Sequence, residues 1–143
     1  MSGTGAIDAC GCFRLPVRVY YEDTDAGGVV YYANYLKYLE RARTEWLRAA
    51  GWDQAGLASE RGLLFAVRTV ELDYRAPARL DDMLEVEARI ADLGHARIDF
   101  EQRVLRDGRP LCTGRVRVVC LDAAAFRPCA LPDDMKEVFA GDD

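Results

Sequence analysis

A helical pattern of apolar residues occupies the stretch from Asn34 to Gly51, which has the sequence NYLKYLERARTEWLRAAG. Apolar side chains recur there at the spacing of a helix and share one face: Tyr35, Tyr38, Leu39, Ala42, Trp46, Ala49 and Ala50, with Leu36 and Leu47 at its margin. Asn34 suits a helix N-cap, and Gly51 suits the position after a helix end. The apolar arc covers roughly half of the circumference, wider than the stripe of a helix on a flat surface. The stretch therefore predicts a helix over 34–50 with a curved sheet wrapped around it.

One charged residue, Arg43, falls inside this apolar arc. A guanidinium in such a place must either reach water along its own stem or find a partner for its hydrogen bonds. Glu40, at the edge of the arc, is the partner that we expect.

Five segments rich in β-formers flank the predicted helix, one before it and four after it: residues 14–22, 63–74, 83–91, 96–105 and 111–121. In the second segment the alternation of apolar and polar residues slips between Val67 and Val70, which predicts a β-bulge. The pair Asp107-Gly108 separates the last two segments and predicts a tight hairpin turn. The element order is therefore one strand, one long helix and four antiparallel strands, which predicts an α+β fold.

Composition favours one soluble globular domain. The chain has 143 residues, 50% of them apolar and 30% charged, and its net charge of −5 with mixed signs argues against a general nucleic-acid binder. No apolar run approaches the roughly 20 residues of a membrane-spanning helix, and no secretory signal pattern is visible. We expect a flexible leader over 1–13 and a single domain over 14–139 that closes with a short helix after Leu131. A cytoplasmic location is expected because the cysteines are interpreted as reduced thiols.

The five cysteines do not match a zinc-binding pattern, which normally pairs cysteines or adds histidines. Cys10 and Cys12 lie in the leader and are expected to be poorly ordered. Cys112 and Cys120 fall on the apolar alternation of the last strand and are expected to be small core residues. With Cys129 they are interpreted as reduced structural thiols, so no disulfide and no metal site is predicted.

Residues 21–35, YEDTDAGGVVYYANY, place three carboxylates and two glycines directly before the predicted helix. A carboxylate at such a junction can act as a base or a nucleophile. Unpaired backbone N–H groups at the start of a helix can bind an oxyanion. Acidic loops with glycines are also common as solvated turns or calcium-type loops, and the residues alone leave both interpretations open.

This segment and its continuation over 36–43 resemble the signature of the 4-hydroxybenzoyl-CoA thioesterase family, and more narrowly the Tol–Pal-associated acyl-CoA thioesterases of the YbgC type. The resemblance spans about residues 14–139 and includes YRAPARLDDML at 74–84, VVCLD at 118–122 and ALP at 130–132. It implies the hotdog fold, in which a five-stranded antiparallel sheet wraps around one long central helix. It also implies hydrolysis of acyl-CoA thioesters, or of acyl carrier protein conjugates, without a metal or another cofactor.

The resemblance also implies roles for the loop residues. The second aspartate of its D-x-D-x-x-G pattern is the catalytic carboxylate, which is Asp25 here. Backbone N–H groups polarise the thioester carbonyl, and Tyr32 occupies one such position. Gly27, Gly28 and Val29 would bind the substrate from the same loop. Asp25 would act either as a general base on water or as a nucleophile that forms a mixed anhydride, and both routes stay open.

One position departs from the narrower resemblance. The Tol–Pal-associated enzymes commonly carry histidine where this chain has Tyr32, whereas tyrosine at that place resembles the aryl-CoA branch. Donation by the main chain would survive the exchange, but acid–base chemistry by an imidazole would not. An aryl-CoA thioesterase is therefore an alternative function.

The single histidine, His95, lies in what we interpret as a tight connection between two strands. An exposed turn residue is the ordinary interpretation. The resemblance offers a sharper one, in which His95 and Arg97 contact the nucleotide of CoA, because basic residues near this hairpin hold CoA phosphates in relatives.

Two other classes of function share the expected fold. A dehydratase or hydratase of thioesters normally requires a histidine partner, and His95 is far in sequence from Asp25. A non-catalytic module that docks acyl carrier protein would keep the fold without thiol release. The resemblance also implies a homo-oligomer that pairs through its sheets, with active sites at the interface and two dimers in a tetramer.

Overall fold

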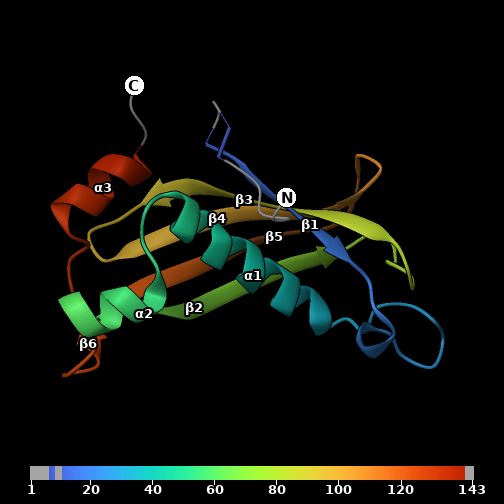
Figure 1. The fold of residues 1–143 in the computed structure, drawn as a ribbon, viewed down its shortest axis with the longest axis horizontal. Coiled ribbons are helices and arrows are strands. Elements are labelled where there is room, and N and C mark those ends of the chain that lie inside the picture. The colour runs from blue at the N-terminus through green and yellow to red at the C-terminus, as the bar shows by residue number, and fades with distance from the viewer. Residues whose placement is uncertain (1–6, 9–10, 141–143) are drawn as a thin grey trace.

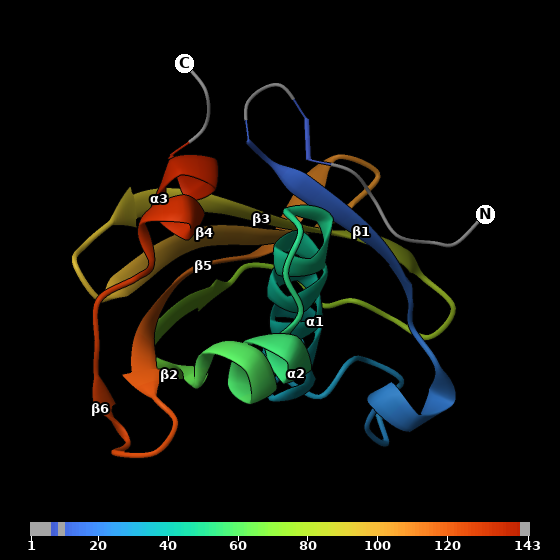
Figure 2. The same ribbon diagram turned by 60° about the vertical axis from the view of Figure 1, so that its left-hand side comes forward.

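The computed structural model describes residues 7–8 and 11–140. Five long strands form an antiparallel sheet that curls around one long helix, α1 (Figures 1 and 2). The strand order across the sheet is β1-β3-β4-β5-β2. The bounds are β1 Phe13–Arg18, α1 Asn34–Ala49, β2 Leu63–Tyr74, β3 Met83–Leu93, β4 Arg97–Arg106 and β5 Arg109–Asp122. This arrangement confirms the α+β class and the antiparallel sheet wrapped around a single long helix.

Several shorter elements complete the chain. The predicted terminal helix is present as α3, Asp133–Phe139, whereas α2, Gln54–Gly56, and the π-helical turn Leu57–Arg61 after it were not predicted. A sixth strand, β6, Arg127–Pro128, adds two residues to the edge of β5, so the sheet exceeds the five strands that were expected.

The first strand is shorter than the predicted segment 14–22, because the chain leaves the sheet after Arg18. Val19 donates its backbone N–H to Asp82. The next residues form a 3₁₀ turn, Tyr21–Asp23, in which the Asp23 carboxylate accepts the backbone N–H of Tyr20. The apolar tyrosines in this stretch therefore belong to a turn and not to a strand.

The core lies between α1 and the concave face of the sheet. The buried residues of the helix are Tyr35, Tyr38, Leu39, Ala42, Trp46 and Leu47. The sheet contributes Leu84, Val86, Ala88, Ile98, Phe100, Val104, Cys112, Val116, Val118 and Cys120. Full burial of one large apolar side chain contributes roughly 1.5–3 kcal/mol, so this interface dominates the stability of the fold. The predicted helix face and the predicted strand alternation are both confirmed.

The cysteine predictions have mixed outcomes. Cys112 and Cys120 are free thiols in the core, as predicted, and burial raises their pKa values to about 11 and about 12. The prediction that Cys12 is poorly ordered is wrong, because its side chain is buried beside β1. Its backbone N–H donates to Asp8, so part of the segment before residue 14 packs on the domain. Cys10 lies outside the described residues.

Three local predictions at turns and bulges can be compared with the structure. The register of β2 against β5 shifts between Val67 and Thr69, which confirms the bulge. Asp107 and Gly108 both have positive φ, at 52° and 78°, in the turn between β4 and β5. Gly51 has φ of 111° after the helix and donates its N–H to Arg48, as expected for a helix end.

Two predictions about α1 are wrong. Asn34 is the first residue of the helix and Ala33 is the N-cap, without a side-chain cap. The Arg43 guanidinium donates to Oε1 of Gln102 at 2.9 Å and, within the described residues, forms no ion pair with the expected partner Glu40, whose charge acts on it without direct contact. Gln102 is buried on the concave face of β4 and also donates to the Leu39 carbonyl. This amide accepts one hydrogen bond from the guanidinium without bringing a second charge into the core.

Candidate active site

The acidic loop before α1 is a narrow turn with Asp25 on its first limb. The backbone N–H of Asp25 donates to the Val29 carbonyl at 2.9 Å, and the N–H of Gly28 donates to the Asp25 carbonyl at 3.0 Å. Gly28 has φ of 79°, a region that a residue with a Cβ rarely adopts. The N–H of Gly27 donates to Oδ1 of Asp25 at 2.9 Å. The loop therefore presents an exposed carboxylate that is oriented by one backbone donor.

A second segment, at the turn after β2, supports this loop. Val30 donates its N–H to the Ala78 carbonyl at 2.8 Å, and Leu80 donates its N–H to the Gly28 carbonyl at 3.3 Å. Tyr35 of α1 accepts the N–H of Ala78 through its hydroxyl at 3.0 Å. The motif YRAPARLDDML thus packs against the loop, and its hydrogen bonds connect the glycine turn to the helix.

Tyr32 lies between the loop and the helix, one residue before the N-cap Ala33. Its carbonyl accepts the hydroxyl of Tyr74 at 3.1 Å and the N–H of Tyr35 at 3.3 Å. Within the part of the chain that the structure describes, its own N–H has no hydrogen-bond acceptor. A free N–H at the positive end of a helix dipole is suited to an anionic oxygen.

Aromatic rings surround this N–H. The ring of Tyr32 meets that of Tyr74 edge-on, with centroids 6.2 Å apart, and Tyr74 meets Tyr35 at 5.3 Å. Tyr31 lies at 4.9 Å on the other side of Tyr32, and a hydrogen bond between their side chains raises the pKa of Tyr31. A cleft of about 280 Å³ opens here, with the following lining: Val30, Tyr32, Tyr35, Tyr74, Arg75, Ala76 and Pro77.

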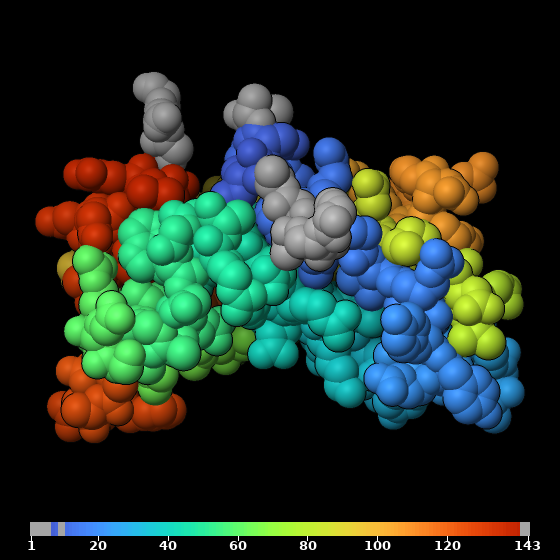
Figure 3. Space-filling view, viewed as in Figure 1, coloured from blue at the N-terminus to red at the C-terminus, as the bar shows by residue number. Residues whose placement is uncertain are grey.

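The predicted residues Asp25, Gly27, Gly28, Val29 and Tyr32 belong to one loop, which is held by backbone hydrogen bonds between its limbs. The segment between the 3₁₀ turn and α1 lies at one end of the molecule (Figures 1 and 3). The structure does not bring His95 and Arg97 to this loop. These two residues follow β3, whose 11 residues span roughly 30 Å from the loop end to the other end. The β3–β4 connection and the loop lie at opposite ends in both ribbon views (Figures 1 and 2).

The surroundings of His95 and Arg97 are those of a strand connection. The side chain of His95 is exposed, and its carbonyl accepts the N–H of Leu131 at 2.9 Å. The guanidinium of Arg97 forms ion pairs with Asp99 at 2.6 Å and Asp92 at 3.1 Å. Among the described residues, neither of the two forms a hydrogen bond or ion pair with the loop that carries Asp25.

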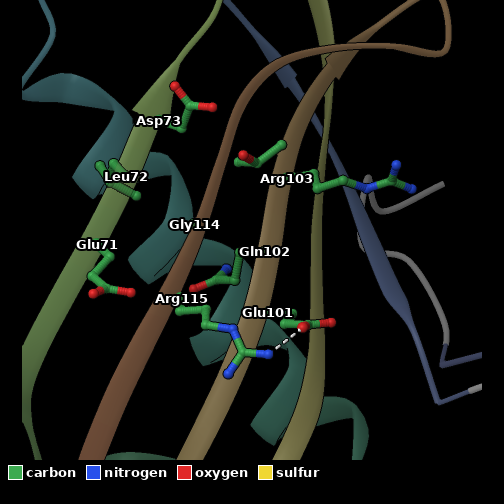
Figure 4. Close-up of a pocket in the computed structure, with 9 residues that line it drawn as sticks. Glu71, Leu72, Asp73, Glu101, Gln102, Arg103, Gly114 and Arg115 are labelled. Carbon is green, nitrogen blue, oxygen red and sulfur yellow. Dashed lines mark hydrogen bonds and ion pairs between the residues drawn. The ribbon is translucent and has the colours of Figure 1, made fainter.

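A separate groove of about 410 Å³ lies on the sheet across β2, β5 and β4 (Figure 4). It contains none of the predicted site residues. Charged side chains from the three strands dominate its walls, and Arg115 is paired with Glu101. Its position and its paired charges separate it from the loop site.

Two features bear on cofactors and membranes. Among residues 7–8 and 11–140, no group of three or more His, Cys, Asp or Glu side chains is placed to hold a metal ion. In the same part of the chain, the helices are all too short or too polar to cross a bilayer.

Tyr35, Tyr74 and Asn34 belong to the site although the sequence analysis gave them no role there. Asn34 donates its side-chain N–H to the carbonyl of Asp23 at the start of the loop. Tyr35 was assigned to the helix face and Tyr74 to a strand and a motif. The motif at 74–84, which follows a strand and contains Pro77, was the available signal that this segment returns to the loop.

The fold and the loop match a known family. The thioesterase-like superfamily matches residues 19–139, so the chain belongs to this superfamily. Within it, the chain is 48% identical to the acyl-CoA thioesterase YbgC of Haemophilus influenzae, over 89% of this chain and 93% of that protein. It is also 48% identical to the acyl-CoA thioester hydrolase YbgC of Escherichia coli, over 89% of this chain and 95% of that protein. A probable thioesterase from Bartonella henselae superimposes with a TM-score of 0.81 at 38% identity, covering 85% of this chain and 99% of that structure.

Proposed function

We propose that this protein hydrolyses acyl-CoA thioesters, with Asp25 as the catalytic carboxylate and the N–H of Tyr32 as an oxyanion donor. The observation that carries the proposal is the free N–H of Tyr32 at the helix start, next to a loop that holds an exposed carboxylate. The similarity to the YbgC acyl-CoA thioesterases supports the reaction class.

The geometry suits both chemical routes. Gly27 holds Oδ1 of Asp25, which leaves Oδ2 for the reaction. As a general base, Asp25 removes a proton from water while the water oxygen bonds to the carbonyl carbon. As a nucleophile, Asp25 itself bonds to that carbon and water later opens the anhydride. In either route the carbonyl oxygen gains negative charge at the Tyr32 N–H, the C–S bond breaks, and the thiolate of CoA leaves and takes up a proton.

A single-turnover reaction in isotopically labelled water tests the anhydride route. Label that enters the carboxylate of Asp25 would establish this route, because water then opens the anhydride at the aspartyl carbon. Label found only in the product acid is the result of the general-base route and equally of an anhydride that water opens at the acyl carbon. Release of free thiol from acyl-CoA by the purified protein is the primary test of the function, and its absence for every acyl group would refute it. We expect the rate to be unchanged after dialysis against a chelator, since the proposed chemistry uses no metal or other cofactor.

An aryl acyl group is a second candidate substrate, favoured by one observation. The cleft beside the Tyr32 N–H has three tyrosine rings in its wall, and rings prefer edge-to-face contact with other aromatic groups. A thiol-release screen over acetyl, butyryl, palmitoyl, malonyl and benzoyl CoA would rank the acyl groups. Acyl carrier protein conjugates belong in the same screen, because a carrier-docking role without hydrolysis predicts binding and no thiol release.

The open edge of the sheet supports assembly with a second copy of the chain. β2 lies at the edge, has 12 residues and exposes Val67 and Val70, and such edges readily pair with another strand. Tyr74 ends this strand and lines the cleft, so a partner there would border the site. We propose dimers that assemble further into tetramers in the cytoplasm. Any contact of His95 or Arg97 with CoA would then come from another subunit.

Sedimentation at micromolar concentration tests the assembly. A species near the 16.0 kDa chain mass would contradict it. Val70→Lys places a charge on the open edge and is expected to shift the distribution toward the single chain. The same change in Val138, which is exposed on α3 away from this edge, is the matched control.

A further inference from the structure

One carbonyl group at the base of the loop before α1 accepts two hydrogen bonds from the segment that leads into the helix. The carbonyl of Asp23 accepts the backbone N–H of Tyr31 at 3.1 Å and the side-chain N–H of Asn34 at 2.8 Å. Asp23 lies two residues before Asp25, and Tyr31 is directly before Tyr32. This carbonyl therefore adds a connection at the base of the loop to the bond between the Asp25 N–H and the Val29 carbonyl, which joins the same two limbs.

Asn34 makes the side-chain part of this connection. It is the first residue of α1, half-buried, and its amide reaches back 11 residues in place of capping its own helix. The helix start thereby becomes attached to the chain just before Asp25. Without the amide, the bond from Tyr31 would be left to hold the carbonyl of Asp23 at the base of the loop.

We infer that Asn34 is a positioning residue, which sets the distance between the carboxylate of Asp25 and the N–H of Tyr32. The inference rests on the proposed function, because the two groups that Asn34 would position have catalytic roles only there. It assigns Asn34 itself no contact with substrate. A misplacement of reacting groups by about 1 Å costs on the order of 10² in rate, so a partial loosening of the loop base should be visible in kcat.

The test compares Asn34→Ala and Asn34→Asp with the wild type, using the acyl-CoA that the wild type cleaves fastest. Alanine removes the donor, and aspartate keeps the size of the side chain but places a carboxylate against the Asp23 carbonyl. We expect kcat to fall about 10- to 30-fold in both variants, while KM stays within about twofold. The aspartate variant keeps the test decisive if the alanine variant does not fold.

A matched control comes from the same helix. The indole N–H of Trp46 donates to the Gly11 carbonyl at 3.3 Å, far along the helix from the loop. Trp46→Phe removes this bond and keeps an aromatic ring in the core. It is expected to lower Tm and to leave kcat unchanged, which separates a loss of stability from a loss of positioning.

The same substitutions in the background of Asp25→Asn complete the test. If Asn34 acts by placing Asp25, its removal there should cost less than about threefold, because the group it positions is already lost. An equal loss in both backgrounds would overturn the inference, and so would a kcat no lower than that of Trp46→Phe. A wild type that releases no thiol would overturn the proposed function and this inference together, whereas an active wild type with active Asn34 variants would overturn the inference alone.

Discussion

The carboxylates on the convex face of the sheet and the carboxylate of Asp25 have opposite surroundings. Each carboxylate of a central row on the sheet is held by two guanidinium groups: Glu87 by Arg14 and Arg103, Asp99 by Arg97 and Arg117, and Glu101 by Arg89 and Arg115. Asp25 is exposed and accepts one backbone N–H from Gly27.

The difference separates acids that stabilise the fold from an acid that is available for chemistry. Burial alone would raise the pKa of Glu87, but the hydrogen bonds and charges of Arg103 and Arg14 outweigh it and lower the pKa. The hydrogen bond from Arg117 is the main cause of the lowered pKa of Asp99. A carboxylate whose two oxygens are each held by a guanidinium group is a weaker base and a poorer nucleophile than a free one. Asp25 retains an unoccupied oxygen, and this is the property that catalysis requires.

The largest expected effect is on Asp25. We expect Asp25→Asn to lower kcat by at least about 10², with fold and KM little changed, because a catalytic carboxylate acts mainly in the transition state. Thiol release under saturating acyl-CoA measures it. Asp99→Asn makes the same chemical change on the sheet and should leave kcat unchanged. Retention of more than about half of the wild-type turnover by Asp25→Asn would remove Asp25 from the mechanism.

A smaller effect, on stability and not on rate, is expected for Glu87. Its side chain is 7% exposed, whereas Arg14 and Arg103 are 50% and 47% exposed and can be rehydrated when the carboxylate is neutralised. Glu87→Gln should therefore lower the free energy of unfolding by about 1–2 kcal/mol, less than for a fully buried pair. Denaturant unfolding measures this change. An unchanged midpoint would show that the ion pairs of Glu87 contribute nothing to stability.

The side chain of Tyr32 should matter less to kcat than the carboxylate of Asp25. If Tyr32 contributes its backbone N–H, then Tyr32→Phe keeps most activity and Tyr32→His is tolerated. Loss of a hydroxyl hydrogen bond would cost about 0.5–1.5 kcal/mol, or roughly 2- to 12-fold in rate. A drop in kcat beyond about 30-fold for Tyr32→Phe would show that the hydroxyl takes part in catalysis.

The smallest expected effect is the change with pH in the contribution of Glu87 to stability. Because the pKa of Glu87 is lower in the folded state, its contribution to stability is present above its unfolded pKa of about 4.3 and is lost as the pH falls through the folded value. The difference in Tm between the wild type and Glu87→Gln should therefore shrink as the pH falls below about 4. Thermal unfolding at pH 7 and pH 3.5 compares the two, and a difference that stays constant would argue against the lowered pKa.

Local periodicity predicted the fold well, and long-range partners explain most of what it missed. The helix face and the alternation of β3 to β5 follow from neighbouring residues alone. By contrast, Arg43 finds its acceptor on Gln102, 59 residues away, and this amide stands in an apolar alternation that gives no sign of a polar contact. The two-residue strand β6 is too short to leave any periodic signal.

The site shows the same division. The motif placed Asp25 and Tyr32 in one loop, since both lie within eight residues of sequence. The hydroxyl of Tyr74 donates to the Tyr32 carbonyl, 42 residues away in sequence. The side-chain amide of Asn34 donates to the Asp23 carbonyl and does not cap its own helix. Such contacts depend on how the curled sheet returns the segment after β2 to the helix, which a residue pattern does not encode.

The buried thiols bear on the compatibility of this protein with its proposed substrate. Thioesters exchange readily with thiolates, so a reactive cysteine would take the acyl group from acyl-CoA onto the protein. With a pKa of about 11, Cys112 is a thiolate in only roughly one molecule in 10⁴ at pH 7, and Cys120, at about 12, is one still more rarely. Both lie in the core beyond the reach of a ligand. Burial between the sheet and the helix thus keeps these two thiols protonated and inaccessible, which prevents their acylation by the substrate.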